Sequence, residues 1–119
     1  MKRRPFRKRI GFAATGIAEG WRGEPSFRTQ AILGVVAIIV TAALRPGLVW
    51  AAIVALAIAV VLALELVNSA FEAMIDHLHP DQADPIRRAK DMAAGAVLAA
   101  SAGAAVAGVL MVAAVASGW

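Results

Sequence analysis

The sequence has 119 residues, enough for one domain and too few for two. Hydrophobic residues make up 61% of it and charged residues only 17%, with a mean hydropathy of +0.73, which is atypical of a water-soluble domain. The net charge of +4 would suit nucleic-acid binding, but the basic residues flank long apolar runs, so we attribute them to membrane orientation and expect no nucleic-acid partner.

The segment 1–24 is predicted to form a helix on the cytoplasmic membrane surface. Its charged side chains lie on one face of this helix. On the opposite face, apolar side chains recur at helical spacing: Phe6, Ile10, Ala13, Ala14, Ile17 and Trp21. Pro25 separates this helix from the next, and Ser26 is predicted as the N-cap of that next helix.

Three apolar runs follow, and none contains a charged side chain: residues 31–44, 48–64 and 92–117. A helix needs about 20 residues to cross ~30 Å of hydrocarbon, so these runs predict transmembrane helices over about 26–44, 48–77 and 88–117. The alternative is a soluble bundle of alanine-rich helices, but the second and third runs lack the polar stripe that such helices turn toward water. We therefore predict an all-α integral membrane fold, with residues 1–119 as one domain in an oligomeric helical bundle.

The basic residues also predict the topology. Eleven of the twelve Lys and Arg residues precede the first span or lie between the second and third, and only Arg45 lies between the first and second. By the positive-inside rule the N-terminus is cytoplasmic and the C-terminus is outside. The turn Arg45-Pro46-Gly47 then lies on the outer side, and the polar loop 80–85 lies on the cytoplasmic side.

The segment ELVNSAFEAMID, residues 65–76, carries the chemistry. Five polar side chains share roughly a 100° arc of one helix: Glu65, Asn68, Ser69, Glu72 and Asp76. Glu65 lies ~26 Å along the helix from its start, close to the inner edge of the hydrocarbon, where an ionisable group is costly and a functional candidate by default. Pairing with a base from a neighbouring helix is the structural alternative for Glu65, and solvation of a projecting helix end explains Asp76.

Three acidic groups on one stripe repel one another unless a cation lies among them, and Mg²⁺ that bridges carboxylates to phosphate meets that need. The topology places Glu24, in the hinge before the first span, and Lys90 and Asp91, at the start of the last, at the same membrane face. His77 and His79 are interpreted as interface residues rather than metal ligands. Small residues at Gly95, Ala99 and Gly103 favour close helix packing, within the chain or between subunits.

At this stripe the sequence resembles the prokaryotic diacylglycerol kinase family of small three-span lipid kinases. The resemblance runs from about Gly11 to the end of the last helix. It is carried by ELVNSAFEAMID, by AKDMAAGAVL (89–98) and, more weakly, by EPSFR (24–28). It implies a homotrimer in the bacterial inner membrane, with active sites shared between subunits, that transfers the γ-phosphate of ATP to a lipid hydroxyl.

The resemblance also implies roles for single residues. Glu65 matches the catalytic base, and Glu24 and Glu72 match the carboxylates that bind Mg²⁺. The nucleotide contacts that it implies are Glu24, Asn68, Glu72, Asp76, Asp81, Lys90 and Asp91. The lipid contacts that it implies are Trp21, Phe27, Arg28 and Glu65.

The predicted lipid is diacylglycerol, which would give phosphatidic acid, and the alternative is undecaprenol, which would give undecaprenyl phosphate. Residues 89–92 are closer to the diacylglycerol branch of the family, and residues 93–98 are closer to the undecaprenol kinase branch. Two alternatives from other classes are a proton-relay subunit that uses Glu65 and Glu72, and a structural oligomer that packs through the Gly95 and Gly103 face.

Overall fold

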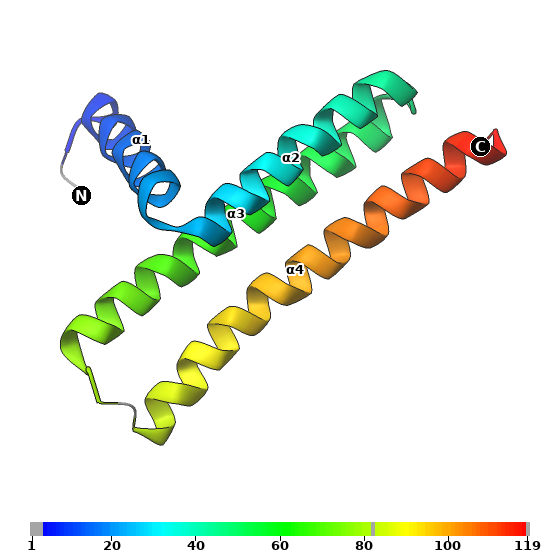
Figure 1. The fold of residues 1–119 in the computed structure, drawn as a ribbon. Coiled ribbons are helices and arrows are strands. Elements are labelled where there is room, and N and C mark those ends of the chain that lie inside the picture. Colours follow the sequence, from blue (N-terminus) through cyan, green and yellow to red (C-terminus); the bar gives the residue numbers. More distant parts are fainter. Residues whose placement is uncertain (1–3, 82, 119) are drawn as a thin grey trace.

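The computed structural model describes residues 4–81 and 83–118, which form four α-helices and no strand (Figure 1). The helices are α1 (Phe6–Gly23), α2 (Pro25–Leu44), α3 (Leu48–Leu78) and α4 (Asp84–Ser117). The last three are long and apolar enough to cross a membrane. The predicted all-α fold with a short first helix and three spans is therefore confirmed.

α2, α3 and α4 run side by side, while α1 lies apart from them, next to the start of α2 (Figure 1). α3 and α4 extend well past this junction before the loop that joins them. The central helix α3 packs against α4 and α2, and α2 and α4 touch each other little. The described part of the chain therefore has a thin core centred on α3.

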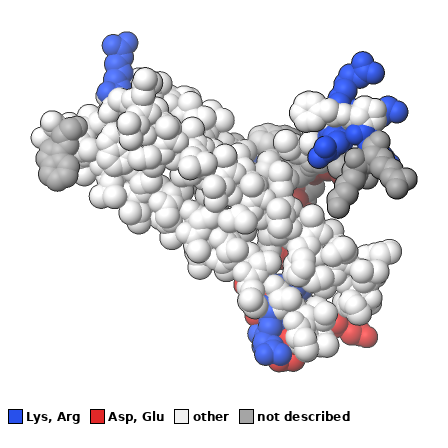
Figure 2. All heavy atoms as spheres, turned by 180° about the vertical axis from the view of Figure 1, so that it is seen from behind, with Lys and Arg blue, Asp and Glu red and all other residues white. Residues whose placement is uncertain are grey.

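The buried apolar side chains are few: Phe27, Val54, Val61, Ile75, Met111 and Ala114. Most other apolar side chains of the three long helices are exposed to the surroundings, as expected where lipid rather than protein covers them. Charged side chains gather on α1 and at the α3–α4 loop, with a basic side chain at the opposite end and an uncharged belt between them (Figure 2).

The start of α2 differs from the prediction. Glu24 is the N-cap and Pro25 is the first helical residue, so the prediction of Ser26 as the N-cap was wrong. Proline suits the first helical position because it has no N–H to leave unpaired and its φ is already helical. α2 ends at Arg45, a left-handed residue with φ of 49°, and Gly47 at φ 103° completes the turn into α3.

α4 also begins earlier than predicted, at Asp84, so that Asp84 and Pro85 belong to the helix and not to the loop. Pro85 lies in the first turn, where a missing N–H does no harm, and the Asp84 carboxylate favours the positive end of the helix dipole. Arg87 and Arg88 both contact Asp84, with shortest N–O distances of 3.0 and 3.4 Å.

Two glycines, Gly20 and Gly34, lie at close contacts between helices. A Cβ at Gly34 would lie 2.9 Å from Cγ2 of Ile58, so α2 and α3 pack closely there. By contrast, a Cβ at Gly95 or Gly103 would meet no atom of the described chain within 4 Å. At Gly95 and Gly103, therefore, α4 does not pack closely against another helix of the described chain.

Candidate functional site

Glu65 is the deepest member of the polar stripe on α3. Only 5% of its surface is exposed, and it forms none of the ion pairs found among residues 4–81 and 83–118. The structural alternative of pairing with a base from a neighbouring helix is thus not realised within the described chain. A buried carboxylate at this depth without a cationic partner is costly, which marks Glu65 as a functional group.

Asn68 lies one turn nearer the α3–α4 loop and has an unused acceptor. Its Oδ1 atom is buried and has no hydrogen-bond partner within the described residues. Unsatisfied buried side-chain oxygens are rare in native proteins because each loses its hydration without a replacement. Glu72, one further turn along, is half-buried. The stripe therefore presents oxygen acceptors that no group of the described chain satisfies.

Asp76 joins the stripe to α4. Lys90 Nζ donates to Asp76 Oδ1 at 2.7 Å, which brings together two predicted site residues that lie on different helices and 14 positions apart in sequence. Asp91, next along α4, accepts from Arg87 Nη1 at 2.8 Å. Asp81 is exposed in the loop. Cationic and acidic groups thus lie together where α3 and α4 leave the apolar belt.

The α1–α2 hinge borders the same region. Gly20 is buried, and a Cβ there would lie 2.5 Å from Cδ2 of Leu66, the residue after Glu65. This close approach seats the end of α1 directly beside the stripe. Glu24 is half-buried at the hinge itself. α1 and α3 therefore meet within one residue of Glu65.

The structure gives the three predicted lipid contacts of the hinge different environments. Trp21 is 45% exposed, whereas Phe27 is only 4% exposed and packs inward against Gly20. Arg28 Nη1 donates to the carbonyl oxygens of Trp21 at 3.0 Å and Arg22 at 3.1 Å, so it caps the last turn of α1. Phe27 and Arg28 thus hold the hinge, a role that the sequence reasoning missed.

The site offers oxygen donors to a hard cation. Within the ranges described, no three His, Cys, Asp or Glu side chains come together as a ready-made metal cage. Mg²⁺ does not require one, because it uses one or two carboxylates and completes its shell with water and phosphate. The Asn68 oxygen and the Glu65 and Glu72 carboxylates, which have no hydrogen-bond or ion-pair partner within the described residues, fit such a site.

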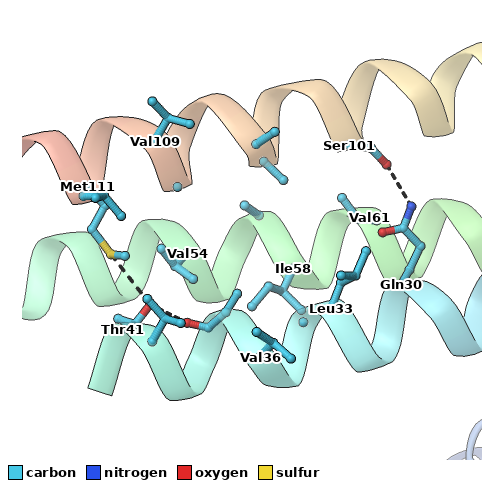
Figure 3. Close-up of a pocket in the computed structure, with 18 of the residues that line it drawn as sticks. Gln30, Leu33, Val36, Thr41, Val54, Ile58, Val61, Ser101, Val109 and Met111 are labelled. Carbon is cyan, nitrogen blue, oxygen red and sulfur yellow. Dashed lines mark hydrogen bonds between the residues drawn. The ribbon is translucent and has the colours of Figure 1, made fainter. Parts of the chain in front are cut away.

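A groove of about 720 Å³ runs between α2 and α4, with α3 as its floor (Figure 3). Its lining is apolar except for Gln30, Thr41 and Ser101. The floor includes Val54, Ile58 and Val61, and Glu65 follows one turn later on the same face of α3. Sequence reasoning missed this groove because three separate helices form it.

Comparison with known proteins identifies the family. The chain matches the sequence profile described as prokaryotic diacylglycerol kinase over residues 11–112. It is 28% identical over 93 residues to the diacylglycerol kinases of Escherichia coli strain K12 and Shigella flexneri, covering 78% of this chain and 76% of each relative. Together with three membrane-crossing helices and an acidic stripe at the end of an apolar groove, these matches decide against the proton-relay and purely structural alternatives. The chain belongs to the prokaryotic diacylglycerol kinase family and is a membrane lipid kinase.

Proposed function

We propose that this lipid kinase transfers the γ-phosphate of ATP to the free hydroxyl of diacylglycerol and forms phosphatidic acid. The observation that carries the proposal is Glu65: a buried carboxylate, without an ion pair in the described chain, at the end of an apolar groove. A lipid hydroxyl that arrives laterally from the bilayer meets a base there without leaving the lipid phase. The family and the names of both relatives support the reaction and favour this lipid.

In the proposed reaction Glu65 accepts the proton of the lipid hydroxyl as its oxygen attacks the γ-phosphorus. The bond from that phosphorus to the bridging oxygen of ADP breaks, and ADP leaves with the electron pair. Phosphoryl transfer needs alignment and charge neutralisation more than covalent participation by the protein. Glu65 is the only member of the stripe deep enough in α3 to face the lipid side of this exchange.

The groups nearer the loop hold the nucleotide in this proposal. Glu24 and Glu72 would bind Mg²⁺, which neutralises charge on the phosphate oxygens. Lys90 adds a second positive charge when it exchanges Asp76 for a phosphate oxygen. The Asn68 oxygen, which has no partner within the described residues, accepts from the nucleotide or its water. Asp81 and Asp91 lie at the outer part of this site. Trp21 borders the lipid headgroup, with the hinge held from behind by Phe27 and Arg28.

The assembly and location are proposed on different grounds. The basic residues at α1 and at the α3–α4 loop support a cytoplasmic site in a bacterial inner membrane, with the C-terminus outside (Figure 2). The face of α4 at Gly95 and Gly103 has no close neighbour among residues 4–81 and 83–118. This face supports a homotrimer that packs through small residues and shares its sites between subunits.

Undecaprenol is the second candidate substrate. Residues 93–98 favour it, and a long apolar groove accommodates a polyprenyl chain as well as an acyl chain. The two lipids differ in what surrounds the reacting hydroxyl: diacylglycerol carries ester carbonyls beside it, and undecaprenol carries only hydrocarbon.

The experiment uses the purified chain in lipid vesicles with Mg²⁺ and ATP, and offers diacylglycerol or undecaprenol separately. We expect phosphatidic acid from diacylglycerol, and a loss of turnover in Glu65→Gln of about a hundredfold or more, as for a general base. Glu19→Gln is the matched control, because Glu19 is an exposed carboxylate on α1 that forms none of the ion pairs of the described residues. Undecaprenyl phosphate as the main product would move the assignment to the second lipid. Near-normal turnover in folded Glu65→Gln would contradict the role of Glu65.

A further inference from the structure

Two hydrogen bonds span the groove between α2 and α4, one toward each end (Figure 3). Toward the loop end, Gln30 Nε2 donates to Ser101 Oγ at 3.2 Å. Toward the end with the α2–α3 turn, the Thr41 hydroxyl lies 2.7 Å from the Ala37 carbonyl oxygen and 3.6 Å from the Met111 sulfur. Because α2 and α4 otherwise touch little, these contacts fix the spacing of the two helices.

The Gln30–Ser101 contact lies at the level of Glu65. Counted from the ends of the helices near the α2–α3 turn, at about 1.5 Å per residue, Gln30 lies about 21 Å along its helix, Ser101 about 24 Å and Glu65 about 26 Å. Thr41 lies about 16 Å from Gln30 along α2, well away from the stripe. Only the first of the two contacts therefore borders the candidate site.

Burial of an amide in an apolar groove costs free energy unless the amide is hydrogen-bonded. Loss of the Ser101 hydroxyl would therefore leave the Gln30 amide at a cost, which favours the contact. The helices that the contact joins carry opposite sides of the site. Glu24 immediately precedes α2, and Lys90 and Asp91 lie on α4. Without this contact, the distance between α2 and α4 can vary at this depth, and with it the distance from Glu24 to Lys90 and Asp91.

We propose that Gln30 and Ser101 are positioning residues for the kinase reaction: their hydrogen bond holds α2 against α4 at the depth of Glu65. The consequence for catalysis rests on the proposed function, whereas the consequence for helix spacing does not. Neither residue touches the reacting atoms. Their effect passes through the alignment of Glu24 on one side with Lys90 and Asp91 on the other.

The test compares pairs of variants that match in shape. Ser101→Val and Ser101→Thr are isosteric with each other, but only threonine keeps the hydroxyl. We expect kcat per folded enzyme to fall about tenfold in Ser101→Val and in Gln30→Leu, since small misplacements of reacting groups have effects of this size or larger. Ser101→Thr keeps kcat within about twofold of wild type, because the acceptor remains.

Thr41→Val is the control for a purely structural role. It removes the other α2–α4 contact without a change in shape, and we expect it to lower thermal stability while kcat per folded enzyme stays unchanged. If Gln30→Leu and Ser101→Val affect kcat no more than Thr41→Val does, or if Ser101→Thr is as slow as Ser101→Val, the positioning role is wrong.

A spectroscopic readout keeps the test independent of activity. The chain has no cysteine, so spin labels on Thr29→Cys and Ala102→Cys report the α2–α4 distance once the labelled protein is diluted with unlabelled protein. We expect this distance distribution to broaden in Gln30→Leu and to stay narrow in Thr41→Val. An unchanged distribution in Gln30→Leu would overturn the inference even in an active enzyme. If the wild-type protein phosphorylated neither lipid, the proposed function would be contradicted. The spin-label distances would still test whether the Gln30–Ser101 hydrogen bond fixes the spacing of α2 and α4.

Discussion

Lys90 on α4 and Asp76 on α3 form an ion pair of 2.7 Å, and the Lys90 side chain is only 18% exposed within it. The pair joins the two helices just before the loop between them. Because Lys90 is proposed to leave Asp76 for a phosphate oxygen, the contact belongs both to the packing of the helices and to the nucleotide site.

We predict that an exchange of the two charges restores the role of this pair in helix packing but not its role in nucleotide binding. Lys90→Asp combined with Asp76→Lys restores the attraction between α3 and α4, and thermal stability returns toward wild type. Turnover remains roughly a hundredfold below that of the wild type, because α4 no longer presents a preorganised positive charge to the phosphates. Thermal unfolding and ATP turnover on the same preparations measure both effects. Full recovery of turnover in the swap would contradict a phosphate-binding role for Lys90.

Replacement of Glu65 by an apolar residue is expected to stabilise the protein while it abolishes activity. Glu65 is buried at membrane depth without a cationic partner in the described chain, so Glu65→Leu removes a desolvation cost on the order of 1–3 kcal/mol. Unfolding of the detergent-solubilised protein by denaturing detergent measures this gain. Glu65→Gln is the control, since it keeps the shape and the polarity. A loss of stability in Glu65→Leu would show that the carboxylate makes a favourable contact, such as one with another subunit.

Substitution of Gly20 is expected to loosen the contact between α1 and α3. A Cβ at this position would lie 2.5 Å from Leu66 Cδ2, the end of a flexible side chain, so Gly20→Ala makes Leu66 turn aside and offsets the gain of about 1 kcal/mol that alanine brings to a helix. Hydrogen exchange of the last turn of α1 reports the change, and Leu66→Ala in the same chain relieves it. Gly16→Ala is the matched control, because a Cβ there meets nothing within 4 Å and alanine is the better helix former. Equal hydrogen exchange in Gly20→Ala and Gly16→Ala would contradict a close contact between α1 and α3 at Gly20.

Removal of divalent cations is expected to stop turnover without unfolding the protein. In the proposed reaction Mg²⁺ binds together with the nucleotide phosphates and does not join helices as a structural zinc ion does, so we expect the fold to persist without it. An excess of EDTA therefore abolishes product formation and leaves the melting temperature within about one degree, and added Mg²⁺ restores activity. A large fall in melting temperature with EDTA would show that a metal holds the fold together.

The membrane fold and the location of the acidic stripe follow from the order of the amino acids alone. Long uncharged runs have few alternatives to a membrane helix, because only a helix satisfies every backbone group within lipid. The arc shared by Glu65, Asn68 and Asp76 follows from helical geometry alone. The family resemblance rests on the same residues and is confirmed, whereas the individual catalytic and metal-binding roles stay predictions.

The contacts between residues of different helices, by contrast, became known from the three-dimensional arrangement. The Asp76–Lys90 pair, the Gln30–Ser101 hydrogen bond and the close approach of Gly20 to α3 all depend on helix rotation and spacing, and one sequence does not define these. In a membrane, lipid covers an apolar face as well as protein does, so hydrophobic periodicity does not show which face packs inward. For that reason the groove, the inward packing of Phe27 and the face at Gly95 and Gly103, which has no close neighbour among the described residues, emerged only from the arrangement of the helices.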